Sequence, residues 1–270
     1  MTNFIFLSKG GEDEYINMLA QSAGQEPTNT DFFDYKYDVT MDGMTPVLRG
    51  ILKYKIMQKC LADNKDFYYV DSGYVGNNIG TRNPMGNKLY HRIVRNDLQH
   101  TTIVPRPSDR WQALGIQMQP RKFGRKIIVA APDEKPCRYY GIDQQQWIDQ
   151  TVAEIKTHTD RPIEIRQRAP KRIDRVATAP LHQILSSNVH ALVTYNSIAA
   201  VEAIFAGVPA FALAPSHVAD PVASKDLSQI ESPVWANQDT LDAWCHSMAY
   251  GQYHVRELRD GTAFRMMQEQ

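Results

Sequence analysis

The sequence predicts a mixed α/β protein of two domains. In the second half of the chain, short apolar runs alternate with segments of helical periodicity. That order is typical of a parallel sheet covered by helices on both faces. The chain has 270 residues, of which 43% are hydrophobic and 22% charged, so two small domains can each bury an ordinary core.

The spacing of apolar residues predicts the elements of the first half. In chain order, we expect a strand at 4–7, a helix at 12–22, a loop at 24–44 with a short strand at 35–39, a helix at 46–62, a strand at 66–70, a loop at 73–87 and a strand at 90–94. Prolines and basic residues then interrupt the chain up to Lys126. The predicted domains are therefore residues 1–118 and 119–270.

The second half alternates more regularly. We expect strands at 127–131, 162–165, 191–194 and 209–213, with helices at 144–158, 180–185 and 197–206 between them. Residues 238–267 are helical in pattern. A C-terminal helix of this kind is expected to pack back across the first domain.

Bulk composition excludes several classes of protein. The formal net charge is zero, so recognition of a polyanion would have to come from a local patch. Cys60, Cys137 and Cys245 lie far apart without a CxxC pair, which argues against disulfides and structural zinc. The apolar run at 4–7 is too short for a signal peptide or a membrane span, so a cytoplasmic location without membrane association is expected.

The segment 193–209 carries the clearest functional pattern. It runs from a strand through Asn196, Ser197 and Ile198 into a helix that carries Glu202 and ends at Gly207. A helix start with free N–H groups attracts phosphate, and a carboxylate nearby can accept hydrogen bonds from ribose hydroxyls. We expect Asn196 or Ser197 to be the N-cap. The alternative is an ordinary αβ unit in which Ser197 only caps the helix and Glu202 is a solvated charge.

This pattern, Asn196-Ser197, Glu202-Ala203 and Gly207-Val208-Pro209, resembles the nucleotide-binding segment of GT-B glycosyltransferases, particularly the capsule-polysaccharide group. The resemblance covers roughly residues 127–213. It implies two Rossmann-like domains that face each other across a cleft, with the second holding a nucleotide-diphosphate sugar. The co-substrate we favour is a UDP-sugar, and no other cofactor is expected.

A second resemblance concerns the acceptor. Asp71-Ser72-Gly73-Tyr74 and the segment 224–231 are similar to bacteriophage-encoded glycosyltransferases, some of which act on hydroxymethylated DNA bases. This similarity implies double-stranded DNA as a partner and, for a phage-encoded chain, the host cytoplasm as its location. The oligomeric state stays open.

The predicted catalytic residues are Asp71 and His217. Asp71 follows a buried strand and should lie at the carboxyl edge of the first sheet, where it can serve as the base for the acceptor hydroxyl. An Asx-turn role is the alternative. His217 lies just beyond the 209–213 strand. Arg168 or Lys171 would neutralise the diphosphate, and no His and carboxylate spacing predicts a metal site.

Basic residues interleaved with aromatic ones suggest an acceptor or DNA surface. The candidates are Arg106, Arg110, Arg121 and Lys122, with Trp111 and Phe123 beside them. Cations and aromatic rings suit phosphate backbones and unstacked bases, although both rings are equally consistent with packing between domains.

The sequence thus predicts a metal-independent glycosyltransferase that modifies a hydroxyl acceptor, with a 5-hydroxymethylated pyrimidine in phage DNA as the favoured acceptor. A polysaccharide or small-molecule acceptor is the nearest alternative. A catalytically silent nucleotide-binding protein and a nucleotide-sugar epimerase are the other hypotheses.

Overall fold

A computed structural model describes residues 3–30, 43–77, 88–167 and 180–269. The chain divides into two compact units, each described by itself. Unit 1 comprises Met1–His100 and Met248–Gln270, and unit 2 comprises Thr101–Ser247. The first segment of unit 1 therefore ends at His100 rather than at residue 118. Unit 1 also includes the C-terminal residues 248–270, which the sequence analysis assigned to the second domain.

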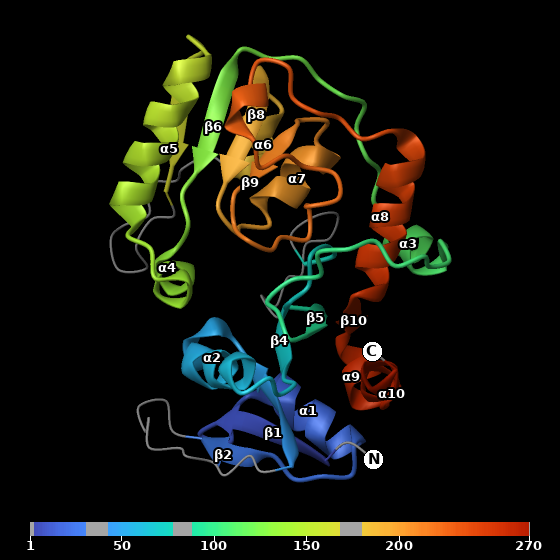
Figure 1. The fold of residues 1–270 in the computed structure, drawn as a ribbon. Coiled ribbons are helices and arrows are strands. Elements are labelled where there is room, and N and C mark those ends of the chain that lie inside the picture. Colours follow the sequence, from blue (N-terminus) through green and yellow to red (C-terminus); the bar gives the residue numbers. More distant parts are fainter. Residues whose placement is uncertain (1–2, 31–42, 78–87, 168–179, 270) are drawn as a thin grey trace. The chain divides into compact units, whose positions relative to one another are not determined.

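The described strands of unit 1 form one twisted sheet in the order β10-β5-β4-β3-β1-β2 (Figure 1). Its strands are β1 (Asn3–Lys9), β2 (Thr28–Thr30), β3 (Met44–Arg49), β4 (Tyr68–Ser72), β5 (Tyr90–Arg95) and β10 (Gln252–His254). The first four are mutually parallel, while β5 runs antiparallel to β4 and β10 antiparallel to β5.

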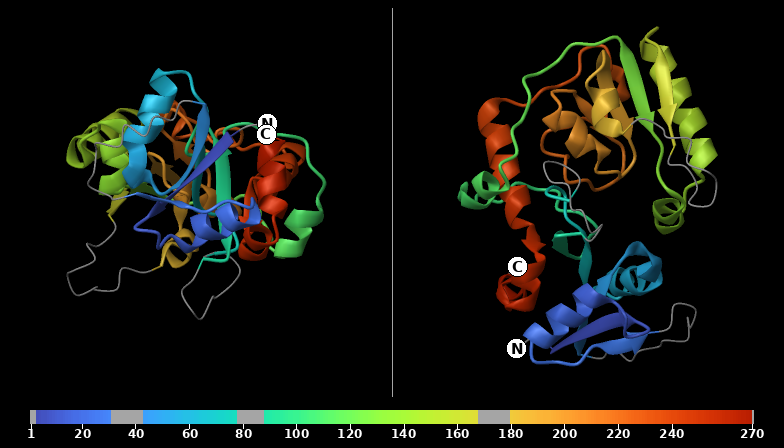
Figure 2. Two further views of the ribbon diagram at one scale, coloured as in Figure 1. Left: turned by 90° about the horizontal axis from the view of Figure 1, so that it is seen from below. Right: turned by 180° about the vertical axis from the view of Figure 1, so that it is seen from behind.

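Helices cover both faces of this sheet (Figures 1 and 2). On one face the core joins the strands to α1 (Glu14–Ser22), α9 (Val255–Arg259) and α10 (Thr262–Gln268), while α2 (Tyr54–Ala62) lies on the other. The Asp13 side chain accepts a hydrogen bond from the Ile16 N–H and caps α1. Tyr68 in β4 donates to the Met267 carbonyl at 3.1 Å, which ties the C-terminal helix to the sheet.

The predicted helix at 46–62 was wrong in its first part. Residues 44–49 form strand β3, in which Val47 and Leu48 are fully buried between β1 and β4. Gly50 then adopts a φ of 79° and turns the chain into a 3-10 helix at Ile51–Lys53, before α2 begins. A short apolar run buried on both faces cannot be distinguished from a helix by periodicity alone.

Unit 2 contains a fully parallel sheet in the order β7-β6-β8-β9. Its strands are β6 (Lys126–Ala130), β7 (Ile163–Arg166), β8 (Val189–Thr194) and β9 (Ala210–Ala212). One face packs on α5 (Gln144–His158), and α6 (Leu181–Leu185) and α7 (Ala199–Phe205) lie on the other (Figures 1 and 2). The predicted α/β class with parallel sheets is confirmed.

The remaining described helices are α3 (Asp109–Leu114), α4 (Glu134–Tyr140), a 3-10 turn at Leu227–Gln229 and α8 (Gln238–Tyr250). The predicted continuous helix at 238–267 is interrupted by β10, because Gln252 to His254 pair with the edge strand β5. The strand predicted at 35–39 lies outside the described residues. No described helix combines the length and apolar character needed to cross a membrane.

Candidate functional site

The sheet of unit 2 has a topological switch point between β6 and β8, because the chain leaves β6 toward β7 and later returns on the other side. Open α/β sheets bind ligands outside the carboxyl ends of the strands at such a point. Thr194 at the end of β8 donates to the Ala130 carbonyl at the end of β6, at 2.8 Å. The predicted Asn196 to Glu202 segment begins directly beyond this bond.

The turn after β8 differs in detail from the prediction. Helix α7 starts at Ala199, so its N-cap is Ile198, and no side chain caps it. Ser197 lies one residue earlier, where its Oγ accepts from the Ala199 N–H at 3.2 Å. The predicted N-cap at Asn196 or Ser197 was therefore wrong by one or two residues. Asn196, Ser197 and Ile198 are half-buried at the sheet edge, so the structure brings them together.

His217 contacts the same turn. Its Nε2 donates to the Ser197 carbonyl at 3.0 Å, and its Nδ1 accepts from the Ala219 N–H at 2.9 Å. These two bonds select the neutral Nε2–H tautomer. The ring is fully buried and both nitrogens are occupied, so the geometry favours a role in positioning the Ser197 turn over the predicted role in proton transfer.

Glu202 is half-buried on α7. Burial raises the pKa of its carboxyl group, and the charge of Arg166 at the end of β7 opposes the rise. Arg166 is thus close enough to act electrostatically on the predicted nucleotide segment. Arg168 and Lys171, predicted to neutralise the diphosphate, lie outside the described residues.

Gly207 allows a close crossing behind α7. Its φ is 79°, and an added Cβ would overlap the Pro120 carbonyl oxygen. The Lys122 N–H also donates to the Gly207 carbonyl at 2.7 Å. The segment before β6 therefore packs directly against the turn that follows α7.

We expect Gly207→Ala to lower the free energy of unfolding by about 2 kcal/mol or more, since it combines backbone strain with a steric overlap. Gly141→Ala is the matched control. Gly141 also has positive φ, 66°, but nothing lies within 4 Å of its Cβ position. Its cost should stay near 1 kcal/mol in urea unfolding. Equal losses in the two variants would contradict the proposed overlap.

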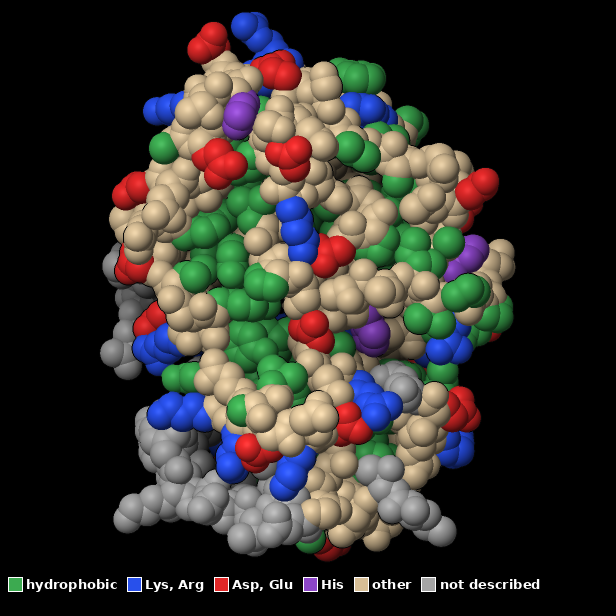
Figure 3. Space-filling model, in the orientation of Figure 1, with side chains coloured by type: hydrophobic (Ala, Val, Ile, Leu, Met, Phe, Trp, Pro, Cys, Tyr) green, Lys and Arg blue, Asp and Glu red, His purple; other side chains and the backbone are tan. Residues whose placement is uncertain are grey.

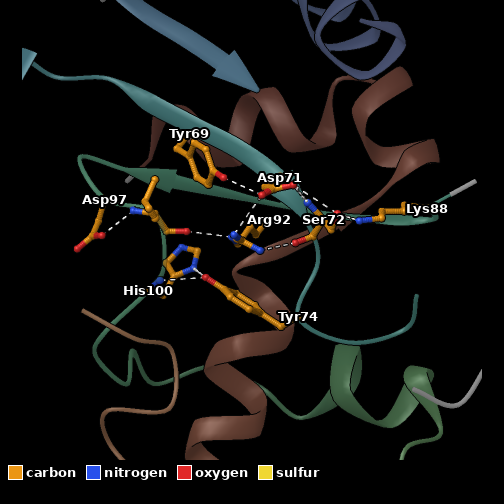
Figure 4. Close-up of polar contacts among 9 residues, drawn as sticks. Tyr69, Asp71, Ser72, Tyr74, Lys88, Arg92, Asp97 and His100 are labelled. Atoms are coloured by element: carbon orange, nitrogen blue, oxygen red, sulfur yellow. Dashed lines mark hydrogen bonds and ion pairs between the residues drawn. The ribbon is translucent and has the colours of Figure 1, made fainter. Parts of the chain in front are cut away.

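In unit 1 a polar network surrounds Asp71, in the second-last position of β4 (Figure 4). The carboxylate accepts from the Tyr69 hydroxyl at 2.7 Å and from the Ser72 N–H at 2.7 Å. Arg92 from the neighbouring strand lies 3.4 Å from the same carboxylate. Burial raises the pKa of Asp71, but the Arg92 charge and these hydrogen bonds outweigh it, so the net pKa lies below its usual value.

Arg92 organises this network. Its side chain is 10% exposed, and it donates to the carbonyls of Ser72 at 2.6 Å and Leu98 at 2.9 Å (Figure 4). Its guanidinium lies over the rings of Tyr69 and Tyr74, at 5.5 and 5.3 Å from their centroids. The sequence reasoning missed Arg92, because an arginine inside a predicted strand is usually assigned to the solvent face.

The predicted acceptor or DNA residues all belong to unit 2. Arg121 donates to the Pro233 carbonyl at 2.9 Å and lies over the Phe123 ring, while Trp111 packs on Phe205 at 5.4 Å between ring centroids. Trp111 is therefore a packing residue within its own unit. Arg106 and Lys122 are exposed and Arg110 is half-buried. On the described face drawn in Figure 3, Lys and Arg alternate with Asp and Glu.

No protein-family model matches the chain, and no curated protein sequence matches it either. Solved structures do. KpsC from Thermosulfurimonas dismutans, described as a β-Kdo 2,4 transferase, aligns with a TM-score of 0.52 at 10% identity, over 91% of this chain and 90% of that one. The chain shares the fold of this transferase. The β-Kdo 2,7 transferase of the same organism's KpsC aligns over 97% and 99% of the two chains, with a TM-score of 0.51 and 11% identity.

Proposed function

We propose that the protein is a glycosyltransferase of GT-B type that uses a nucleotide-activated sugar. The observation that carries the proposal is the fold likeness to two sugar transferases over almost the whole chain. It is supported by the parallel sheet of unit 2, whose switch point carries the Asn196 to Glu202 segment.

For the donor, we propose that the turn at Asn196, Ser197 and Ile198 lies against the phosphates and that Glu202 accepts from the ribose. Arg168, Lys171 and neighbouring Arg166 are the proposed cations for the leaving phosphate group. UDP-sugars remain the favoured donors. Because the two structural neighbours are Kdo transferases, an activated Kdo belongs in the same test.

We expect one nucleotide among UDP, GDP, CMP and their sugar conjugates to raise the melting temperature of the wild-type protein. A ligand at 100 times its Kd stabilises the folded state by about 2.7 kcal/mol. Glu202→Gln should weaken that ligand about tenfold, because it replaces a charged acceptor. Glu154→Gln, an exposed position on α5, should leave binding unchanged. If none of these nucleotides raises the melting temperature, the support for a donor site is lost.

For the acceptor, we propose a hydroxyl group that is deprotonated with the help of Asp71. The finer proposal is a 5-hydroxymethylated pyrimidine in phage DNA, supported by the exposed Arg106 and Lys122 and by half-buried Arg110. Arg121, already bonded to Pro233, gives this acceptor less support. Transfer assays should therefore compare hydroxymethylated DNA, unmodified DNA and glycan acceptors.

Transfer to hydroxymethylated DNA alone would decide for the DNA acceptor, and transfer to a glycan alone would decide against it. We propose that the reaction needs no metal ion, so the rate should be the same with and without EDTA. Release of an epimerised sugar without an acceptor would instead favour the epimerase hypothesis.

A further inference from the structure

Three buried side-chain atoms among the described residues of unit 1 lack a hydrogen-bond partner: Asn17 Oδ1 and two further atoms that share one neighbour. The two that share a neighbour are the Nε of Arg49 and the Nδ1 of His91. Both side chains contact one ring, that of Tyr15: the His91 ring centroid lies 3.8 Å from it, and the Arg49 guanidinium lies 4.6 Å from it. A buried polar atom without a partner costs free energy, so such atoms often mark a ligand or water site.

The two atoms have opposite hydrogen-bonding character. His91 Nε2 lies 3.1 Å from the Lys88 carbonyl, which can only accept, so the proton is on Nε2 and Nδ1 is an acceptor. Burial and the charge of Arg49 lower the pKa of His91 to about 3, so the ring stays neutral. Arg49 Nε can only donate. A group that satisfies both atoms carries one hydrogen-bond acceptor and one hydrogen-bond donor.

Cations outnumber carboxylates around this position. Lys53 lies on the same edge of the sheet, where its Nζ donates to the Leu7 carbonyl at 2.6 Å. The pKa of Lys53 is lowered to about 8, mainly by burial. Asp13 raises it, while the charges of Arg49 and Lys9 contribute to the lowering. Asp13 also lies 3.6 Å from Arg49, so one carboxylate serves both cations. A bound anion would relieve this mutual repulsion.

The backbone points to the same place. In the sheet of unit 1, β2 lies on one side of β1, and the next strand in the chain, β3, lies on the other side. A switch point therefore lies between β1 and β3. Arg49 ends β3, and Tyr15 is the second residue of α1, whose N-terminus follows β1. The N-terminus of α1, which is capped by Asp13, therefore lies at this switch point.

We propose that Arg49, Lys53 and His91 form an acceptor subsite for an acidic sugar unit, which presents a carboxylate or a phosphate beside a free hydroxyl. The oxyanion accepts from Arg49 and lies near the Lys53 ammonium, while the neighbouring hydroxyl donates to His91 Nδ1. The role as an acceptor subsite rests on the proposed glycosyltransferase function with a glycan acceptor, the alternative to the DNA base, but anion binding does not.

Calorimetric titration with glucuronate, glucose 6-phosphate and neutral glucose tests the subsite. We expect at least one acidic probe to bind more tightly than glucose. Binding of glucuronate alone would assign a carboxylate, and binding of glucose 6-phosphate alone would assign a phosphate. If inorganic phosphate binds with the same affinity as glucose 6-phosphate, the sugar hydroxyl contributes nothing to binding. That result would contradict the role given to His91.

Lys53→Met should weaken the acidic probe at least tenfold. Lys59→Met is the matched control, since Lys59 is exposed on α2 and pairs with Asp63. His91→Phe should weaken the sugar probe but leave inorganic phosphate unaffected. Circular dichroism confirms that each variant is folded before titration. Equal affinity in Lys53→Met and wild type, or no preference for acidic probes over glucose, would overturn the subsite.

The affinity should also depend on pH in one direction. Below about pH 8 the Lys53 side chain is charged, and above it the ammonium is lost, so binding should weaken as pH rises from 7 to 9. Near pH 8 the anion favours the protonated form, so binding should take up about half a proton. The charged groups facing Lys53 are Asp13 at the N-cap of α1, Arg49 on β3 and Lys9 on β1. Binding without proton uptake would exclude Lys53 from the subsite.

Failure of the subsite and failure of the proposed function give different results. If acidic probes bind as expected but no sugar nucleotide is turned over, the anion site stands and the transferase proposal fails. If transfer occurs and Lys53→Met leaves the acceptor KM unchanged, the transferase proposal stands and the subsite fails.

Discussion

Replacing Arg92 with methionine is expected to lower the free energy of unfolding of unit 1 by about 3 kcal/mol, because it leaves two buried carbonyl groups without their donor and the Asp71 carboxylate, one-third exposed, without its cation. The substitution removes the bonds to the Ser72 and Leu98 carbonyls as well as the ion pair with Asp71. Methionine fills a similar volume, so the cost comes mainly from unpaired polar groups and less from a cavity.

Arg95→Met is the matched control for this experiment. Arg95 lies on the same strand and pairs with Asp66 at 2.6 Å, but its side chain is 42% exposed. An exposed ion pair contributes about 0–1 kcal/mol, so the control should unfold almost as the wild type does. Urea unfolding should be followed by probes in each unit, because two units need not unfold together. Similar losses in the two variants would contradict the role given to Arg92.

The double variant Asp71→Leu and Arg92→Met separates the pair from its surroundings. Breaking a buried ion pair is more costly than replacing both partners by apolar residues. The double variant should therefore be more stable than Arg92→Met alone. If the two losses simply add, the contact at 3.4 Å contributes little and the carbonyl bonds of Arg92 account for its effect.

Local periodicity predicted the elements whose residues face water on one side. Helix α5 has the predicted bounds of 144–158, since Trp147, Ile148, Thr151 and Ile155 are buried at helical spacing. Strand β3 was missed because Val47 and Leu48 are buried in a central strand, where apolar residues do not alternate. Strand β10 was missed because its pairing with β5 joins residues more than 150 positions apart.

In the candidate sites, too, the sequence predicted local features but not contacts between separate elements. The sequence placed Asp71 and the Ser197 turn at the carboxyl edges of their sheets, because a strand followed by small polar residues marks such an edge. It did not place Arg92 on Asp71, since that contact depends on the antiparallel register between β4 and β5. It likewise did not bring Tyr15, Arg49 and His91 together, because they come from three separate elements.

Asp71→Asn is expected to reduce kcat for glycosyl transfer by about 10²- to 10⁴-fold, the range typical for loss of a general base. The lowered pKa keeps Asp71 ionised at neutral pH, so the carboxylate is available as a proton acceptor. It also makes Asp71 a weak base for a free hydroxyl. We therefore expect proton transfer late in the reaction, when bond formation to the sugar has made the hydroxyl more acidic.

Two measurements separate this catalytic role from a structural one. Tyr69→Phe removes the hydrogen bond of 2.7 Å to Asp71 but keeps the carboxylate and its contact with Arg92, so kcat should change only a few-fold. Donor binding to Asp71→Asn, measured by thermal shift, should match the wild type, because the proposed donor segment belongs to unit 2. If Asp71→Asn binds the donor and retains more than about a tenth of wild-type kcat, Asp71 is not the base. In that case Asp71 serves to hold Arg92, and the proton of the acceptor must leave by another group.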